Sequence, residues 1–287
     1  MINKSKTTLA LMITGSTGYA SFKYLIKKYT ISNIFTNSTS EKIINLAKKN
    51  YIQIFQGNPT KITNLNNLKK IFKSKPDIIF SINYPYYINK KIINYSNIIS
   101  LNIHGSLLPR YKGRGPLVRA IMNGDRYTGI TVHEIDQKYD SGKILIKKKM
   151  TIPSTASGYD MLKKYEIIYP LIIEKSIKLI LSKKVTFQKQ KELLSKPFKA
   201  ISENDRIIKW QKNTNNILNQ IRAFSYPFNG AIAIINNKKI IIDKATKFKM
   251  GNKINYRYGI IIKVVNKKPV LKTRDGYIMI KKYRLLK

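Results

Sequence analysis

Residues 9–18 read Leu-Ala-Leu-Met-Ile-Thr-Gly-Ser-Thr-Gly and indicate the fold class of this 287-residue chain. The apolar run at 9–13 is typical of a short buried strand, and the glycine-containing segment at 15–18 follows it as a turn. An amphipathic stretch over 20–28 then predicts a helix. A strand, a glycine turn and a helix in this order begin a doubly wound α/β domain. The turn lacks the full Gly-x-Gly-x-x-Gly spacing, so it predicts a tight connection rather than a dinucleotide site.

The same alternation of short apolar runs and amphipathic stretches continues along the chain. We expect strands at 31–35, 52–55, 77–82, 98–103, 128–134 and 144–151, and helices at 41–49, 64–73, 116–122 and 157–181. This order predicts an α/β fold with a Rossmann-like, doubly wound, mostly parallel sheet. A helix over 207–224 and strands at 231–242, 259–265, 269–273 and 277–282 predict a small OB-like C-terminal β-barrel. The expected domains are therefore 1–182 and 204–287, joined by a basic linker over 183–203.

The composition excludes several classes of protein. The chain has no cysteine and only two histidines, so we expect neither a disulfide framework nor a metal site. No apolar run is long enough to cross a bilayer, and we expect no membrane insertion. The apolar-leaning run at 8–14 fits an opening strand better than a secretory signal. We therefore expect a cytoplasmic protein.

The charge is strongly unbalanced, with 55 basic against 14 acidic residues and a net charge of +41. Such an excess suggests a polyanionic partner, for example nucleic acid or an anionic membrane face. However, the chain is rich in Ile, Asn, Lys and Tyr, whose codons are AT-rich, and its lysines are spread along the chain. Compositional drift explains the charge better, although a selected polyanion surface stays open. Either way, the charge should steer phosphate-bearing substrates inward in a salt-dependent way.

The chemistry of the chain is concentrated in residues 102–116, which read Asn-Ile-His-Gly-Ser-Leu-Leu-Pro-Arg-Tyr-Lys-Gly-Arg-Gly-Pro. Asn102 and His104 are two apart at the end of a predicted strand, so their side chains share one face. Ligands of open α/β sheets bind at such carboxyl ends. An amide can donate to a developing oxyanion, and an imidazole can move a proton near neutral pH. His133, inside the predicted strand 128–134, is expected to be structural.

Segment 102–116 resembles the signature of the formyltransferases that use 10-formyltetrahydrofolate. The resemblance covers nearly the whole chain, through residues 76–80, 123–125, 128–131 and 140–142 and then 205–210, 221–223 and 227–231. It implies that Asp140, from a separate loop, joins Asn102 and His104 as a catalytic residue. A carboxylate beside an imidazole stabilises the protonated ring and fixes its orientation. Together the three groups would support the tetrahedral intermediate of formyl transfer.

The resemblance also implies where the co-substrate 10-formyltetrahydrofolate binds. The expected binding residues come from two loops and one arginine: Tyr86, Tyr87, Ile88, Arg114, Asp136, Gln137, Lys138, Tyr139 and Asp140. Backbone groups of the loops would hold the pterin, and apolar walls would cover its ring. Tyr86 and Tyr87 could instead be ordinary core or surface aromatic residues.

The identity of the formylated amine depends on a few short segments. Methionyl-tRNA formyltransferases usually carry a basic loop after the second strand, whereas residues 36–42 here read Thr-Asn-Ser-Thr-Ser-Glu-Lys. Residues 113–117, Gly-Arg-Gly-Pro-Leu, resemble the Gly-Arg-Ala-Pro-Leu of enzymes that formylate 4-amino-4-deoxy-arabinose on a uridine nucleotide. Residues 80–88 also resemble the enzymes that act on nucleotide-linked sugars more than the methionyl-tRNA enzymes. We therefore expect the primary amine of a nucleotide-linked amino sugar as acceptor.

Other functions stay open at this point. The first alternative is the initiator methionyl-tRNA, and another small amine such as glycinamide ribonucleotide is a further one. A basic nucleic-acid-binding protein on an inactive formyltransferase fold is disfavoured, because it should have lost one of the three catalytic groups and all three are present. The sequence does not indicate an oligomeric state.

Overall fold

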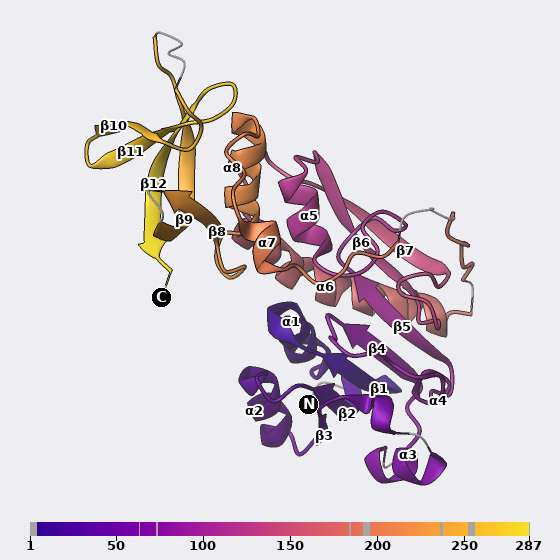
Figure 1. Ribbon diagram of the computed structural model, residues 1–287. Helices are drawn as coiled ribbons and strands as arrows, with labels where there is room; N and C mark the ends of the chain where they lie inside the picture. Colours follow the sequence, from indigo (N-terminus) through magenta and orange to yellow (C-terminus); the bar gives the residue numbers. More distant parts are fainter. Residues whose placement is uncertain are drawn as a thin grey trace. The chain divides into compact units, whose positions relative to one another are not determined.

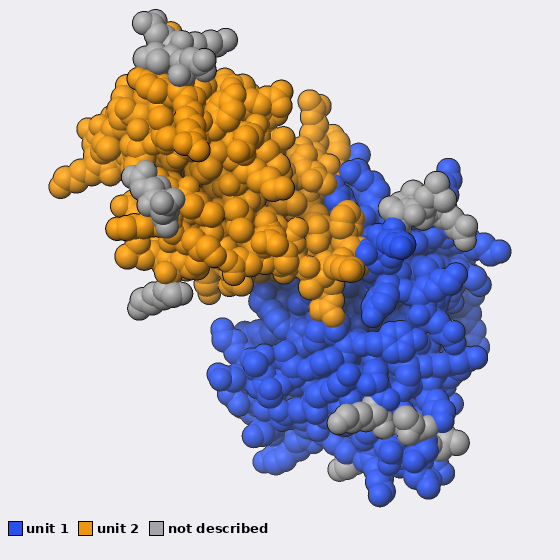
Figure 2. All heavy atoms as spheres, in the orientation of Figure 1, with its two compact units in different colours: residues 1–112, 129–149, 163–197 blue, residues 113–128, 150–162, 198–287 orange. Residues whose placement is uncertain are grey.

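The computed structural model describes residues 5–62, 64–72, 74–183, 185–191, 196–235, 238–251 and 256–286. Two compact units make up the chain (Figure 2). Unit 1 comprises residues 1–112, 129–149 and 163–197, and unit 2 comprises residues 113–128, 150–162 and 198–287. The units therefore group the segments differently from the expected division at 182 and 204, which stays a prediction. Part of the expected linker, residues 184 and 192–195, lies outside the described residues.

A seven-stranded sheet in the order β3-β2-β1-β4-β5-β6-β7 organises unit 1 (Figure 1). Its strands are β1 Ser5–Ile13, β2 Tyr29–Thr36, β3 Gln53–Gln56, β4 Ile78–Ile82, β5 Ile99–His104, β6 Tyr127–Glu134 and β7 Ile144–Thr151. The first five strands pair in parallel, and β6 pairs with β5 in antiparallel. This mixed, mostly parallel sheet confirms the Rossmann-like expectation.

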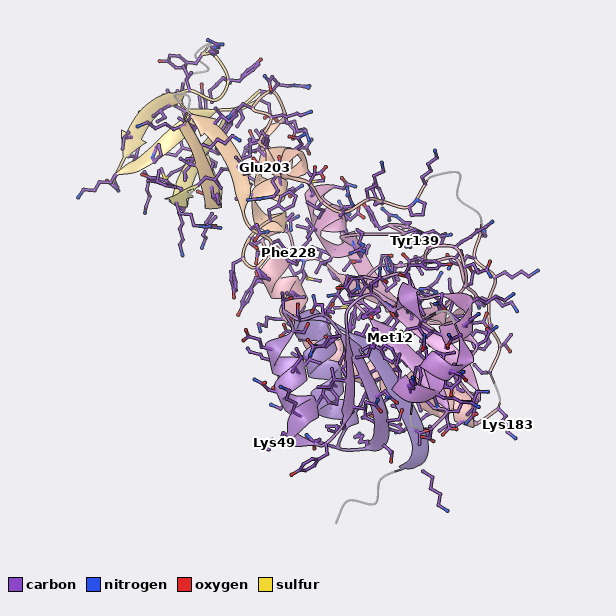
Figure 3. The ribbon with its side chains drawn as sticks, turned by 60° about the horizontal axis from the view of Figure 1, so that its bottom comes forward. Met12, Lys49, Tyr139, Lys183, Glu203 and Phe228 are labelled. Atoms are coloured by element: carbon purple, nitrogen blue, oxygen red, sulfur yellow. The ribbon has the colours of Figure 1, made fainter. Side chains whose placement is uncertain are left out.

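Helices cover the sheet and explain why its central strands are continuous apolar runs. The described helices that precede unit 2 are α1 Gly15–Leu25, α2 Glu41–Lys49, α3 Leu65–Ile71 and α4 Lys90–Ile93, with a 3-10 turn at Pro59–Lys61. Met12 of β1 packs in one core cluster with Phe72, which directly follows α3, and with Ile92 of α4 (Figure 3). Residues of β1 on the other face, such as Leu11, are equally inaccessible to solvent. Strands covered on both faces need apolar side chains at every position.

The long helix α6, Gly158–Leu181, begins in unit 2 and continues in unit 1. Within unit 1 its Glu174 accepts hydrogen bonds from Tyr24 of α1, at 2.5 Å, and from Lys28, at 3.0 Å. Tyr165 is buried, and its hydroxyl lies 3.1 Å from the carbonyl of Gly105 and 3.0 Å from that of Gly129. Helix α6 thus contacts the backbone at the end of β5 and in β6 through one side chain.

A five-stranded antiparallel sheet in the order β10-β11-β12-β9-β8 dominates unit 2. Its strands are β8 Ala231–Ile235, β9 Lys238–Phe248, β10 Ile261–Val265, β11 Lys268–Lys272 and β12 Tyr277–Leu285. The helices of this unit are α5 Pro116–Met122, α7 Glu203–Arg206 and α8 Thr214–Ala223. Helix α8 packs against both α5 and β9. This smaller antiparallel sheet after the α/β unit confirms the predicted C-terminal β domain at the level of a five-stranded antiparallel sheet.

Two expected elements of this unit differ in the structure. The helix expected over 207–224 begins only at Thr214, because the side chain of Asn213 caps it by accepting from Asn216 N at 2.9 Å. Ile207 instead bridges to Ile232 of β8. The strand expected over 231–242 is two strands, β8 and β9, which pair as a hairpin with Ile235 opposite Lys238.

Candidate active site

Four polar side chains converge where β5 and β6 pair. The antiparallel register places Asn102 opposite His133, and the Asn102 amide nitrogen lies 3.0 Å from His133 Nε2. Asp140, in the loop between β6 and β7, approaches both histidines: Oδ2 is 3.5 Å from His104 Nδ1, and Oδ1 is 3.6 Å from His133 Nε2. The structure therefore brings the three predicted catalytic residues together, and it places His133 beside them.

The loop after β5 holds the His104 ring. His104 Nε2 lies 2.8 Å from the backbone carbonyl of Tyr111. Thr131 of β6 fixes that loop, because its hydroxyl donates to Ser106 O at 2.7 Å and accepts from Leu108 N at 3.1 Å. The hydroxyl of Ser106 closes the turn by donating to the carbonyl of residue 110 at 2.6 Å. These bonds explain why a long polar and proline-containing motif follows the Asn-x-His pair.

The contact with Tyr111 sets the tautomer of His104. A carbonyl oxygen can only accept, so Nε2 carries a hydrogen in every protonation state that keeps this bond. In the neutral ring the lone pair is therefore on Nδ1, the atom that faces Asp140. Nδ1 is then the atom of His104 that gains and loses a proton, and the carboxylate stabilises the protonated form.

The environment of His104 contains opposing influences on its basicity. Burial is the largest of them and lowers the pKa of His104 below the usual 6.5 of an imidazole. The negative charge of Asp140 and the hydrogen bond to the Tyr111 carbonyl act in the opposite direction, while His133 adds to the lowering. The net effect keeps His104 neutral, and therefore able to accept a proton, at neutral pH.

His133 has a defined role in this arrangement. Its Nδ1 lies 2.7 Å from the backbone carbonyl of Glu134, so Nδ1 carries a hydrogen and Nε2 of the neutral ring accepts. The acceptor faces the amide nitrogen of Asn102, which fixes the rotation of that amide. The expectation that His133 is structural missed this contact. The register of β5 and β6 would have been needed to find it from sequence.

The loop that carries Asp140 is held at several points. Asp136 accepts from Lys138 N at 2.5 Å, and the hydroxyl of Ser141 donates to the Lys138 carbonyl at 3.0 Å. Asp140 itself has a left-handed backbone, with φ of 51°. Gly142 lies so close to β6 that a Cβ there would be 2.0 Å from the carbonyl of Glu134. Such close approach allows only glycine at this position.

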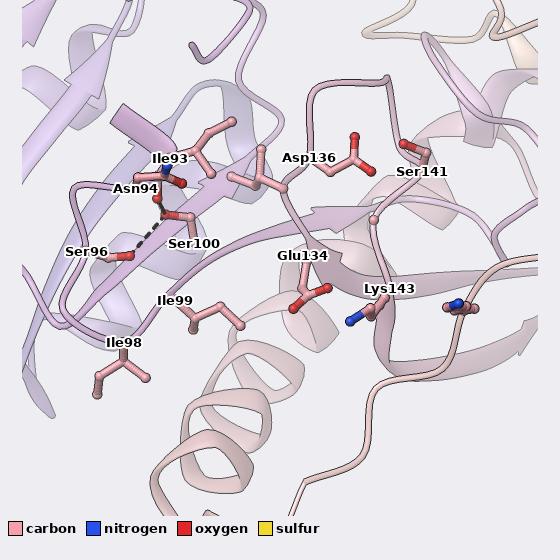
Figure 4. Close-up of a pocket in the computed structure, with 13 residues that line it drawn as sticks. Ile93, Asn94, Ser96, Ile98, Ile99, Ser100, Glu134, Asp136, Ser141 and Lys143 are labelled. Atoms are coloured by element: carbon pink, nitrogen blue, oxygen red, sulfur yellow. Dashed lines mark hydrogen bonds between the residues drawn. The ribbon is translucent and has the colours of Figure 1, made fainter. Parts of the chain in front are cut away.

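A cavity of about 690 Å³ opens beside this loop (Figure 4). Its walls come from the end of α4 and the segment after it, the start of β5, the end of β6, the loop that carries Asp140, and residue 189; they comprise Ile93, Asn94, Ser96, Ile98, Ile99, Ser100, Glu134, Ile135, Asp136, Ser141, Gly142, Lys143 and Lys189. Apolar side chains alternate with polar groups around it, which is the usual character of a small-molecule site. The three predicted catalytic residues do not line this cavity, but Ser141, which follows Asp140, does.

The predicted folate-binding residues take different positions. Asp136 lines the cavity, whereas Ile88 is buried in the core with Ile92. Tyr87 and Tyr139 are exposed, and their ring centroids lie 6.4 Å apart, so the two predicted loops approach each other. Tyr86 packs edge-on against Tyr84, while Gln137 and Lys138 are exposed. Arg114 belongs to unit 2, where its backbone N–H donates to the Phe198 carbonyl at 2.9 Å.

The described part of the chain lacks two further features. In that part of the chain, no group of three histidine, aspartate or glutamate side chains is arranged to hold a metal ion. Nor does any helix among those residues have the length and apolar character to cross a membrane.

Comparison with known proteins places this geometry in context. The family model described as formyl transferase matches residues 4–167, and the model described as its C-terminal domain matches residues 200–287. The bifunctional polymyxin resistance protein ArnA of Wigglesworthia glossinidia brevipalpis is 34% identical over 220 residues, covering 77% of this chain and 33% of that protein. The chain thus spans about a third of that relative's length.

Further relatives have comparable similarity. The methionyl-tRNA formyltransferase of Methylacidiphilum infernorum is 31% identical over 225 residues, which cover 75% of this chain and 70% of that protein. Among solved structures, an N-formyltransferase from Helicobacter canadensis, in complex with folinic acid and dTDP-3-aminofucose, superposes with a TM-score of 0.71. It is 22% identical, and the match covers 96% of this chain and 98% of that chain.

Proposed function

The chain belongs to the formyl transferase family, and from this premise we propose that it transfers the formyl group of 10-formyltetrahydrofolate to the primary amine of a nucleotide-linked amino sugar. The observation that carries the proposal is the convergence of Asn102, His104 and Asp140 beside a cavity. An amide, an imidazole and a carboxylate are the groups that acyl transfer to an amine requires.

Each side chain has a distinct task in this reaction. The acceptor amine forms a bond to the formyl carbon, the bond from that carbon to the folate nitrogen breaks, and the proton that the amine loses ends on the departing folate nitrogen. Asn102 directs one amide hydrogen to His133 and has a second for the formyl oxygen as negative charge develops. His104 exchanges the proton at Nδ1, and Asp140 stabilises the imidazolium that results.

The cavity is the proposed site for the pterin part of the co-substrate. Its volume of about 690 Å³ is within the range of about 300–1,000 Å³ that is usual for small-molecule sites. Ile93 and Ile135 offer apolar surface for a ring, and Ser100 and Asp136 offer hydrogen-bonding groups near its edge. Because Asp136 and Asp140 are on one loop, a pterin ring held in the cavity would place the formyl-bearing nitrogen, which is attached beside the ring, toward Asp140.

Sequence and comparison both support a sugar nucleotide as the acceptor. The chain lacks a basic loop at 36–42, and its segment 113–117 resembles that of sugar enzymes. The Helicobacter canadensis structure, whose crystals hold dTDP-3-aminofucose, points in the same direction. The second candidate is initiator methionyl-tRNA, which the net charge of +41 and the Methylacidiphilum relative favour.

Parallel formylation assays test the proposal. Purified protein would receive 10-formyltetrahydrofolate with a UDP-linked amino sugar, a dTDP-linked amino sugar or methionyl-initiator tRNA, and His104→Ala would serve as the inactive control. We expect turnover with a sugar nucleotide and a shallow dependence on salt. Turnover with tRNA alone, falling steeply as salt rises, would refute the acceptor. Absence of transfer to all three amines would refute the proposed function.

A further inference from the structure

A short segment of the expected linker packs against the rest of unit 1. Residues 185–191, which we call the strap, belong to unit 1. Gln188 forms an antiparallel bridge with Ile144 at the start of β7, with N–O distances of 2.7 and 2.9 Å in the two directions. The strap therefore extends the sheet beyond β7, at the point where the Asp140 loop ends.

Gln190 is the residue of the strap that reaches this loop. Its side-chain nitrogen donates to the backbone carbonyl of Asp140 and to that of Gly142, each at 2.8 Å. An amide NH2 has two hydrogens, so both are used. Rotating the amide by half a turn would place its oxygen against two carbonyl oxygens, and the two acceptors thus fix its orientation. The Gln190 oxygen is buried and has no hydrogen-bond partner among the described residues.

These two hydrogen bonds hold the part of the loop in which the backbone of Asp140 is strained. Asp140 has a positive φ of 51°, a conformation that costs a non-glycine residue free energy and persists only where its surroundings enforce it. Gln190 ties the carbonyl of Asp140 to the carbonyl two residues later, and Gly142 is in turn packed against Glu134. The direction of the Asp140 side chain, and with it the contact to His104, follows from this backbone.

We propose that Gln190 is a positioning residue, which holds Asp140 in place against His104 by binding the backbone carbonyls of Asp140 and Gly142. The proposal deepens and rests on the proposed formyl transfer. It assigns the strap a part in the reaction, although Gln190 is not among the side chains that would touch the substrate.

The test compares Gln190→Met, which keeps the length of the side chain but removes both N–H groups, with Gln188→Met. Gln188 is the matched control, because its described contacts to Ile144 use the backbone only. Gln190→Lys provides rescue, since its ammonium group can donate to both carbonyls. The first readout is kcat and KM for the acceptor amine. The second readout is the NMR titration of the His104 ring in protein with 15N-labelled histidine, which needs no turnover.

The two histidines of the chain make this titration simple, and His104→Ala assigns the signals. In Gln190→Met we expect kcat to fall about 10- to 100-fold, the scale of a misplacement of about 1 Å, with KM within about threefold. The midpoint of the His104 titration should move to lower pH, because Asp140 no longer supports the protonated ring. Among the described residues, the charged and titratable groups that act on this ring are Asp140 and His133.

Unchanged kcat and an unchanged His104 titration in Gln190→Met would overturn the proposal. So would a lower kcat with an unchanged titration, or an equal loss in Gln188→Met, because both indicate a general structural effect. Recovery in Gln190→Lys supports positioning. If the unmodified protein formylates none of the acceptors, the proposed function fails, whereas the titration still decides whether Gln190 positions Asp140.

Discussion

Replacing Asp140 by Asn tests the electrostatic core of the site. The substitution keeps the shape of the side chain and removes its charge, which lies 3.5 Å from His104 Nδ1. Two unit charges at this distance attract by about 5 kcal/mol at an effective dielectric constant of about 20. Asp140 is 14% exposed, so solvent screens part of this attraction, and we expect about 2–3 kcal/mol to remain. This corresponds to a loss of roughly 30- to 150-fold in kcat/KM.

The assay is formyl transfer by Asp140→Asn and the unmodified protein over a range of pH, with circular dichroism to confirm folding. The pKa of His104 should fall further in the variant, because burial and His133 continue to lower it and the carboxylate no longer opposes them. The limb of the pH profile that reports His104 should therefore move to lower pH. Glu41→Gln, at an exposed position on α2, controls for the loss of one negative charge. A kcat/KM within about threefold of the unmodified value, at every pH, would refute the electrostatic role.

Three further predictions concern neighbours of the site and the helix behind it. His133→Ala removes the acceptor that orients Asn102, so kcat should fall by about 10- to 100-fold with little change in KM, and unchanged kcat would contradict it. Tyr165→Phe removes a buried hydroxyl whose single hydrogen is shared between two backbone carbonyls, at a cost of about 2 kcal/mol, so calorimetry should show Tm lower by about 4–8 °C. Burial opposes the charge of Glu174, but hydrogen bonds outweigh it and lower its pKa from 4.5 to about 2. Its stabilisation should be complete above pH 4.5 and lost as pH falls toward 2, and a denaturation difference from Glu174→Gln that persists at pH 2 would refute this.

Much of the fold could be predicted because its signals are local. The buried strands of unit 1 are apolar runs bounded by turns, and α2 and α5 occupy the predicted ranges. Unit 2 was harder, because its elements depend on contacts that periodicity does not show. The segment at 207–213 is apolar enough for a helix, yet Ile207 bridges to β8 and Asn213 starts the helix later.

Only the residues of the candidate site that lie within one sequence motif could be predicted from the sequence itself. Asn102 and His104 share a strand face, so their proximity follows from their spacing. Asp140 could be joined to them only through resemblance, because loop placement depends on tertiary structure. His133 and Gln190 carry no local signal: one acts through the register of two antiparallel strands, and the other through a bridge to the edge of β7.

The interleaving of the two units along the chain has a consequence for dissecting the protein. Unit 2 contains residues 150–162, and Arg222 of α8 donates to the Ala156 carbonyl at 2.7 Å. Gly158 is packed so closely that a Cβ would be 2.5 Å from the carbonyl of Ala223. A fragment ending at residue 182 would therefore keep one half of these contacts and lose the other. Halves divided there should be insoluble alone and recover when expressed together, as complementing fragments that share one fold.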